Sequence, residues 1–355
     1  MRLTLSAVLL GSLAVPSLAS SQTDSGRTAD VRPEVARYVD FYQGAGRDQM
    51  QRFLERGAQY RGDIRARLDQ QGLPSEFEFL PLIESGYRND AVSKAGAVGM
   101  WQFIPATARQ YGLRVDRMVD ERRDPALATD AAVRHIGDLT RSFGSPLLAA
   151  AAYNGGAGRV RRGLSRLGWS DGPDSTDRPD FFDLASGGFL AKETRNYVPK
   201  LLAAAMIGRD PVRYGFQPGS GATRPPSDSV SVGRAVRLDQ LAKALGVRPK
   251  ALTDLNPAMV RGIAPASTRW IRVPAGLGDS LRLKLPDLPT APIADLAIGS
   301  PRRVTFGMLI RVRRGDSLID LATRHGVGVD ALRKANALPK NYPLKAGMAL
   351  RLPGN

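Results

Sequence analysis

The carboxyl most suited to chemistry in this chain is Glu84, in the sequence PLIESGY. The preceding run PSEFEFLPLI is apolar, so Leu80, Leu82 and Ile83 should be buried beside it, and Gly86 offers a helix stop. A carboxyl held against apolar side chains has a raised pKa, because such surroundings penalise its charged form. That group could act as a general acid near neutral pH. On this segment alone, an ordinary exposed glutamate at a helix end is the alternative.

Polar groups that suit a neutral sugar follow Glu84 in three segments. Hydroxyl and N-acetyl substituents are recognised by hydrogen-bond donors and acceptors rather than by charge. The segments AVSKAGAVGMWQF, AAYNGG and ETRNYV supply Ser93, Gln102, Tyr153, Asn154, Glu193, Arg195 and Tyr197. Each residue alone could have a structural role, and Tyr153 alone is more typical of a core tyrosine. Together, in this order, they favour a sugar-binding cleft.

Helical patterns from Pro33 to about Tyr214 must position these groups. Apolar residues with helical spacing form a stripe at Tyr38, Tyr42, Met50, Phe53 and Leu54. No convincing strand is found in this region, so it is predicted to be all-α.

Three later helices carry or flank the polar segments. Asp124-Pro125 is typical of a helix start, followed by the amphipathic run ALATDAAVRHIGDLTRSF. The run LLAAAAYNGG should be a buried helix that ends near its glycine pair. The run KETRNYVPKLLAAAMIG should be a last helix, interrupted or kinked at Pro199.

Beyond a segment rich in Gly, Pro and Ser, the chain repeats itself. LDQLAKALGVRPKALTDLN matches LIDLATRHGVGVDALRKAN, and both share the order strand, helix, Gly-Val turn, helix, Asn, strand. The predicted divisions are a signal peptide (1–19), a disordered segment (20–31), a helical domain (32–216), a linker (217–229), a degenerate repeat (230–285), a second linker (286–301) and an intact repeat (302–355).

Composition and the amino-terminal residues indicate an exported protein. A positive start, an apolar run and the sequence Ser17-Leu18-Ala19 are typical of a cleaved secretory signal; the alternative is a retained anchor. The sequence contains no cysteine, which excludes disulfides and leaves no attachment point for a lipid. The net charge of +17 favours an anionic partner, but export argues against nucleic acid.

The ordered segments ES-G-Y, S-KAGAVGMWQ, AYNGG and ETRNYV resemble the goose-lysozyme-like lytic transglycosylases of the soluble lytic transglycosylase fold. LPSEFEFLPLIES, DERRDP and the carboxyl-terminal repeats narrow the resemblance to the membrane-bound lytic murein transglycosylase D type. The resemblance covers about residues 35–215 and most of the tail. It implies a mainly α fold: a lysozyme-like all-α catalytic domain followed by small βααβ LysM-type modules.

The resemblance also assigns roles to individual residues. It implies that Glu84 is the catalytic acid and base. The implied substrate-binding residues are Ser93, Met100, Gln102, Tyr153, Asn154, Glu193 and Tyr197. Members of this type carry a lipid-attachment cysteine after the signal, which this chain does not have. A periplasmic or cell-envelope protein that is not a lipoprotein is therefore expected.

The number of carboxyls bears on the mechanism. An ordinary glycosidase uses two carboxyls that flank the bond, whereas the resemblance gives Glu193 a binding role. The second function would then fall to the 2-acetamido group and 6-hydroxyl of N-acetylmuramic acid, with a 1,6-anhydro product. No cofactor or metal is expected, because His135 and His325 are too few and too far apart. The alternatives are a hydrolytic muramidase and a non-catalytic peptidoglycan-binding scaffold.

The second repeat resembles a LysM module, which binds glycans that contain N-acetylglucosamine. The resemblance implies glycan contacts at Gly315, Asp316, Ser317, Leu318, Asn336, Ala337 and Leu338. Asp316 could also be a helix N-cap. The first repeat has Gly233-Arg234-Ala235-Val236 in place of the G-D-S-L loop, so it either binds sugar weakly or serves as a spacer. The expected partner is the peptidoglycan strand, bound by a monomer; association with the membrane or with wall machinery stays open.

Overall fold

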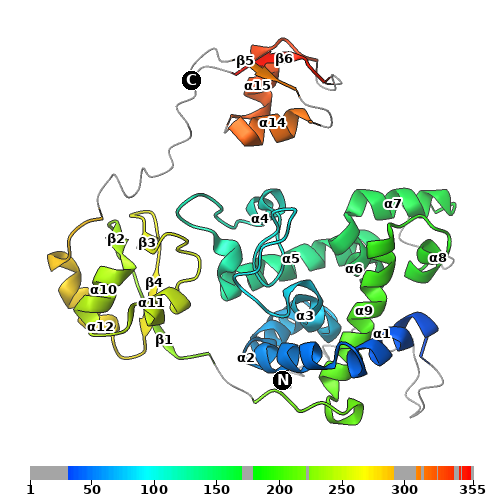
Figure 1. Ribbon diagram of the computed structural model, residues 1–355, viewed down its shortest axis with the longest axis horizontal. Helices are drawn as coiled ribbons and strands as arrows, with labels where there is room; N and C mark the ends of the chain where they lie inside the picture. Colours follow the sequence, from blue (N-terminus) through cyan, green and yellow to red (C-terminus); the bar gives the residue numbers. More distant parts are fainter. Residues whose placement is uncertain are drawn as a thin grey trace, which may run out of the picture. The chain divides into compact units, whose positions relative to one another are not determined.

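The computed structural model describes residues 31–169, 179–220, 224–291, 309–312, 316–325, 327–339, 344 and 346–352. The predicted signal peptide, and all but the last residue of the segment predicted to be disordered, lie outside this range. The chain divides into two compact units, one ending at Thr290 and one beginning at Ala291 (Figure 1). Within the described residues, no helix combines the length and apolar character needed to span a membrane.

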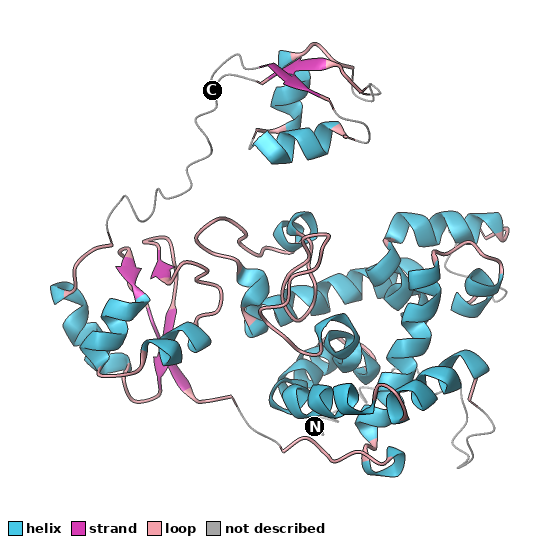
Figure 2. Ribbon diagram, viewed as in Figure 1, coloured by secondary structure: helices cyan, strands magenta, loops and turns pink. Residues whose placement is uncertain are grey.

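The first unit begins with a helical region, residues 31–220, shown in Figure 2 without strands. Its elements are α1 (Pro33–Gln43), α2 (Arg47–Gln70), η2 (Ser75–Phe79), α3 (Leu80–Ser85), α4 (Pro105–Gln110), η3 (Glu121–Arg123), α5 (Pro125–Phe143), α6 (Pro146–Gly155), α7 (Ala157–Arg166), α8 (Phe181–Ser186), α9 (Lys192–Arg209) and η4 (Val212–Tyr214). The prediction of an all-α region is confirmed for the described residues, where only isolated β-bridges occur before Ser227.

Local chemistry explains where these helices begin and end. Asp124 caps α5 by accepting hydrogen bonds from the backbone N–H groups of Ala126 and Leu127, and Gly144 ends this helix in the left-handed conformation. Helix α9 runs without a break through Pro199, so the predicted interruption is wrong.

One hydrophobic core holds the helical region together. Helix α6, rich in alanine, is buried, and it packs against both α5 and α9. Its small side chains allow close approach of the neighbouring helices. Because α9 also contacts α1 and α3, the residues on α3, α6 and α9 are fixed relative to one another.

The first repeat, which we define as residues 227–290, has a core of its own within the first unit. Its elements are β1 (Ser227–Val230), β2 (Val236–Arg237), α10 (Leu238–Leu245), α11 (Pro249–Leu255), β3 (Ile263–Ala264), β4 (Ile271–Pro274), α12 (Gly278–Lys284) and η5 (Leu285–Asp287). Strands β1 and β4 are antiparallel, with Ser227 opposite Pro274 and Val230 opposite Ile271, and β2 pairs with β3. Strand β1 begins inside the segment predicted to be a linker.

The second repeat, which we define as residues 309–352, lies in the second unit and has a separate small core. Its elements are β5 (Leu309–Arg311), α14 (Leu318–His325), α15 (Val329–Ala335) and β6 (Ala349–Arg351). The antiparallel pair β5–β6 and its two helices give the βααβ order. The predicted fold class, a mainly α domain followed by small βααβ modules, is confirmed.

Candidate active site

A cleft of about 700 Å³ opens in the helical region, and the predicted site residues converge on it. Its walls come from the end of α3, the loop between α3 and α4, helix α5, the end of α6 and the start of α9. Among its lining residues are Glu84, Ser93, Gln102, Tyr153, Asn154 and Glu193. Residues that are far apart in the sequence therefore share one cavity.

Glu84 lies in the last turn of α3, which Gly86 ends with a positive φ of 60°. The preceding Leu80 and Leu82 are buried, as the sequence predicts, whereas Ile83, also predicted to be buried, is only partly buried. Burial raises the pKa of Glu84 to about 7; a hydrogen bond from Tyr197 opposes this rise, and the nearby charge of Glu193 adds to it. Near neutral pH a large share of this carboxyl is therefore protonated.

Two tyrosines lie beside this carboxyl: Tyr197 is buried and Tyr153 is partly buried. The hydroxyl of Tyr197 on α9 donates a hydrogen bond of 2.5 Å to Oε1 of Glu84. The hydroxyl of Tyr153 on α6 donates instead to the carbonyl oxygen of Trp101, at 2.8 Å. Burial and then the charge of Glu84 raise the pKa of both phenols well above the usual range, so both stay neutral. Tyr197 thus acts as a donor to Glu84, whereas Tyr153 ties α6 to the neighbouring loop.

Asn154 and Glu193 form a polar edge to the cleft. The amide of Asn154 donates to Oε1 of Glu193 at 3.3 Å, and its oxygen accepts a hydrogen bond of 2.9 Å from the hydroxyl of Thr194. Thr194 is buried, whereas Glu193 is exposed. Asn154 is therefore held in one orientation, and the exposed carboxylate is available to a ligand.

The loop from Ser93 to Phe103 supplies the opposite wall. The hydroxyl of Ser93 accepts a hydrogen bond from the backbone N–H of Ala97. Gln102 has a positive φ of 49°, which is strained for a residue with a side chain, and its amide donates to the Gly99 carbonyl oxygen at 2.7 Å. Hydrogen bonds within the loop and one strained backbone position therefore shape this wall.

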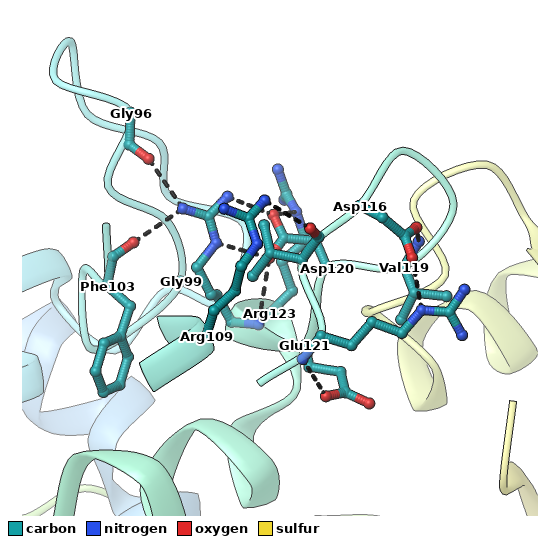
Figure 3. Close-up of polar contacts among 12 residues, drawn as sticks. Gly96, Gly99, Phe103, Arg109, Asp116, Val119, Asp120, Glu121 and Arg123 are labelled. Carbon is teal, nitrogen blue, oxygen red and sulfur yellow. Dashed lines mark hydrogen bonds and ion pairs between the residues drawn. The ribbon is translucent and has the colours of Figure 1, made fainter. Parts of the chain in front are cut away.

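Arg122 provides the support for this loop, and Figure 3 labels its partners Gly96, Phe103 and Asp120. Its Nη1 donates to the carbonyl oxygens of Gly96 at 3.0 Å and Phe103 at 2.9 Å, near the two ends of the loop. Its charge is paired with Asp120, at 2.8 Å, and both side chains are almost completely buried. Gly99 lies so close that a Cβ atom there would be 1.9 Å from the Arg122 carbonyl oxygen.

These contacts identify a function for the motif DERRDP that sequence reasoning missed. In the sequence this motif serves only as a mark of family resemblance, although an Arg between acidic residues is compatible with a buried ion pair. Arg122 belongs to the site as a positioning residue and not as one that contacts a ligand.

His135 also lines the cleft, on α5. Its Nδ1 is 3.0 Å from the hydroxyl of Tyr111. Burial lowers the pKa of His135 to about 4, with the charge of Asp138 acting in the opposite direction, so the ring is neutral at pH 7. Within the described residues, no cluster of three or more His, Asp or Glu side chains could hold a metal ion.

Two of the predicted binding residues lie behind the cleft rather than in its lining. The side chain of Met100 is buried in the hydrophobic core, and its carbonyl oxygen accepts a hydrogen bond of 2.9 Å from the Ser85 hydroxyl. Tyr197 is also buried and reaches the cleft only through Glu84. Both hold the end of α3 in place.

In the second repeat, several residues predicted to bind glycan have structural partners. Ser317 and Asp320 make reciprocal hydrogen bonds at the start of α14, which is a capping arrangement. Asp316 instead forms an ion pair of 2.6 Å with Arg324, so the alternative assignment of Asp316 as the cap is wrong.

The amide of Asn336 is fully engaged in the structure. It bonds both backbone groups of Arg351 in β6 and the Leu332 carbonyl oxygen. Asn256 in the first repeat makes the same bonds to Arg272 and Leu252, which explains why both repeats have this asparagine.

The remaining predictions in the second repeat concern backbone positions and one residue outside the described range. Leu318 begins α14, Ala337 has a positive φ of 50°, and Leu338 is buried. Gly315 lies outside the described residues.

Comparison with protein families gives three matches along the chain. Residues 64–173 match "Transglycosylase SLT domain". Residues 227–290 match "Lytic transglycosylase MltD, LysM-like domain", and residues 310–353 match "LysM domain".

Comparison with individual proteins agrees with these matches. "Membrane-bound lytic murein transglycosylase D" of Escherichia coli is 31% identical over 321 residues, which cover 86% of this chain and 68% of that protein. "Putative tributyltin chloride resistance protein" of Alteromonas sp. is 31% identical over 153 residues, 41% of this chain and 74% of that protein. Among solved structures, an inactive mutant of the lytic transglycosylase Slt from Pseudomonas aeruginosa matches with 26% identity and a TM-score of 0.35, covering 45% of this chain and 25% of that one.

Proposed function

This chain belongs to the membrane-bound lytic murein transglycosylase D family, and we propose that it cleaves peptidoglycan with Glu84 as its single acid and base. It is a peptidoglycan lytic transglycosylase. The bond cleaved is the β-1,4 linkage between N-acetylmuramic acid and N-acetylglucosamine. The observation that carries this proposal is a half-buried Glu84 with a pKa of about 7 in a cleft that also contains Ser93, Gln102 and Tyr153.

In the first step, the protonated carboxyl of Glu84 gives its proton to the glycosidic oxygen. The bond from that oxygen to C1 of the muramic acid breaks, and the N-acetylglucosamine side leaves as an alcohol. The 2-acetamido group of the muramic acid stabilises the positive charge that develops at C1. The pKa of about 7 supports this role, because a carboxyl with an ordinary pKa would already be ionised near neutral pH.

In the second step, Glu84 acts as a carboxylate. It takes the proton from the 6-hydroxyl of the same muramic acid, and the oxygen attacks C1 to close a 1,6-anhydro ring. The proton returns to Glu84, so no water is consumed and the enzyme is ready for another cycle. The hydrogen bond from Tyr197 supports this step, since it stabilises the ionised form.

The other predicted cleft residues would hold the sugar in place. Ser93 and Gln102 lie on the loop that Arg122 supports, and we assign them to the muramic acid and its N-acetyl group. Tyr153 and Asn154 would line the cleft, while Glu193 would offer its exposed carboxylate to sugar hydroxyls. Arg122 would set the position of the loop without touching the substrate.

We also propose that the second repeat binds N-acetylglucosamine in the wall through the backbone around Ser317, Leu318 and Ala337. The engaged side chain of Asn336 supports a structural role for that residue. A weak glycan-binding module in the same chain raises the local concentration of substrate at the cleft. The site of action would be the cell envelope after export.

A hydrolytic muramidase is the second candidate, and one observation favours it. Glu193 lines the same cleft as Glu84, and a second carboxylate could activate water. Its exposure and its hydrogen bond from Asn154 fit sugar binding as well.

Mass spectrometry of digested peptidoglycan separates these candidates. The transglycosylase should release muropeptides with 1,6-anhydro ends that take up no ¹⁸O from labelled water. Reducing ends that contain ¹⁸O would instead identify a hydrolase. A Glu193→Gln variant completes the test: it should still form anhydro ends, whereas a hydrolase that uses this carboxylate would lose its activity.

A further inference from the structure

The first repeat is fixed to the helical region by specific contacts. Arg272 of β4 forms an ion pair with Asp124, the residue that caps α5, and both side chains are largely buried. The backbone N–H of Asp120 donates to the carbonyl oxygen of Ala258 at 2.9 Å. Arg114 adds a hydrogen bond of 2.9 Å to Ser267. These contacts hold the repeat in one position against the helical region.

A groove of about 860 Å³ lies between the helical region and the first repeat, separate from the catalytic cleft. One wall comes from α2 and from Tyr87 to Asp90 after α3; the other comes from α11 and the end of β4. Because both walls are held by the interface contacts, the groove exists before a ligand arrives. Preformed sites of this size are typical of ligand binding.

The groove carries an excess of positive charge. Five arginines line it, against two aspartates: Arg56, Arg88, Arg123, Arg224 and Arg248, with Asp90 and Asp254. Both aspartates already have partners, since Arg88 binds Asp90 at 3.0 Å and Lys250 binds Asp254 at 2.7 Å.

Arg123 lies 4.0 Å from Asp120, so three of the five arginines line the groove without an acidic partner. Across the described part of the chain, Arg56, Arg224 and Arg248 form no ion pair with a carboxylate within 4.0 Å. Burial raises the pKa of Tyr60, while a hydrogen bond from Asn89 and the charges of Arg224 and Arg56 oppose the rise. Both guanidinium groups thus act on the same phenol.

This chemistry fits carboxylates and not a neutral glycan. A guanidinium group binds a carboxylate through two parallel hydrogen bonds. The groove also has Pro225, Pro226, Pro257 and two tyrosines along its sides, a surface that suits an extended peptide. In peptidoglycan, the parts that carry carboxylates are the peptide stems on the muramic acids.

We propose that this groove, built jointly by the helical region and the first repeat, binds the carboxylates of peptidoglycan peptide stems. This inference rests on the proposed function, because it takes peptidoglycan as the substrate. Glu84 lines the catalytic cleft, and Tyr87 to Asp90, which begin three residues later in the chain, line the groove. A stem of four extended residues spans about 13 Å, so it can extend well beyond the sugar that carries it. The degenerate repeat would then select strands that carry peptides.

The test compares two substrates in the full-length protein: glycan strands that carry their stems, and strands from which an amidase has removed the stems, so that each muramic acid keeps only its lactyl carboxylate. The variant is Arg224→Gln with Arg248→Gln. Its KM on stem-bearing strands should rise about tenfold, the loss expected from two partly exposed charge pairs, whereas its kcat and KM on bare strands should stay unchanged. Added salt should raise the KM of the parent protein on stem-bearing strands and have little effect on the variant.

A matched control removes the same charge elsewhere. Arg213→Gln with Arg282→Gln lowers the net charge by the same amount at exposed positions outside the groove, and its KM values should match those of the parent. An equal rise of KM on both substrates would mean that the groove binds glycan, and equal values for the variant and its control would mean that only overall charge matters. Either result overturns the proposal. A parent protein inactive on bare strands and on stem-bearing strands would instead count against the proposed function.

Discussion

Two adjacent segments, η2 and α3, place glutamates in opposite surroundings. In η2, Glu78 is completely buried and forms ion pairs with Arg61 at 2.8 Å and Arg65 at 2.6 Å. The equally buried Glu76 forms an ion pair with Arg209 at 2.8 Å. In α3, Glu84 has no arginine or lysine within ion-pair distance among the described residues.

The difference shows that burial alone does not make a catalytic acid. Arg61 and Arg65 of α2 both pair with Glu78, and these ion pairs join η2 to α2. Without a cation, burial favours the protonated form, and the pKa of Glu84 rises to about 7. The Tyr197 hydroxyl limits that rise, so the group can serve in both protonation states.

The largest expected effect comes from Glu84→Gln. The amide keeps the size of the side chain but cannot transfer a proton, so kcat for release of anhydro-muropeptides should fall by about 10³-fold or more. The measurement is the rate of solubilisation of purified sacculi.

Folding of this variant supplies the control. Because the folded-state pKa of Glu84 lies above the unfolded value, the carboxyl favours unfolding increasingly as pH rises from about 4.5 to about 7. The glutamine variant cannot ionise at this position and is not destabilised in this way, so its Tm at pH 8 should equal or exceed that of the parent. A variant that solubilises sacculi at the parental rate would remove Glu84 from its role.

The next change, at Glu78, should affect stability and not catalysis. Glu78→Gln leaves two guanidinium groups without their carboxylate, which should lower the free energy of unfolding by about 3 kcal/mol, the lower end for a broken buried pair because Arg65 is half exposed. Urea unfolding measures this. At temperatures where the variant is folded, its kcat should stay within about threefold of the parental value; a loss as large as that of Glu84→Gln would erase the distinction between the two segments.

Tyr197→Phe should have an intermediate effect that depends on pH. Loss of the hydrogen bond to the ionised form raises the pKa of Glu84, so the fall of kcat/KM with rising pH should move from about 7 to a higher pH. At the pH optimum, kcat should drop about tenfold, because the Glu84 carboxylate that takes the proton from the 6-hydroxyl is less stabilised. An unchanged pH profile would show that the hydroxyl does not act on this carboxyl.

The sequence predicts the part of this comparison that depends on local pattern. An apolar run that ends at a Ser-Gly turn is enough to place Glu84 at the end of a helix and beside buried leucines. The capped start of α5 at Asp124 follows equally from a Pro after an acidic residue.

The rest depends on contacts between distant residues. Glu76 and Glu78 stand in the same apolar run as Glu84, and only the folded chain brings Arg209, Arg61 and Arg65 to the first two. The hydrogen bonds from Arg122 to both ends of the cleft loop, and the fixed position of the first repeat, arise in the same way from pairs far apart in the sequence.

The smallest expected effect, from His135→Gln, tests whether Glu84 acts alone. His135 lies in the same cleft, and a histidine is the usual alternative for proton transfer near pH 7. Burial holds its pKa at about 4, so the ring is neutral between pH 5 and 8 and has no proton to lose in that range. Glutamine can still form a hydrogen bond with the Tyr111 hydroxyl, so kcat should change less than about threefold. Loss of a residue that takes part in acid–base catalysis would lower kcat far more. The pH at which kcat/KM falls should not move. If it did, the titration near pH 7 would belong to the histidine as well, and the absence of a cation around Glu84 would no longer explain the acid in this cleft.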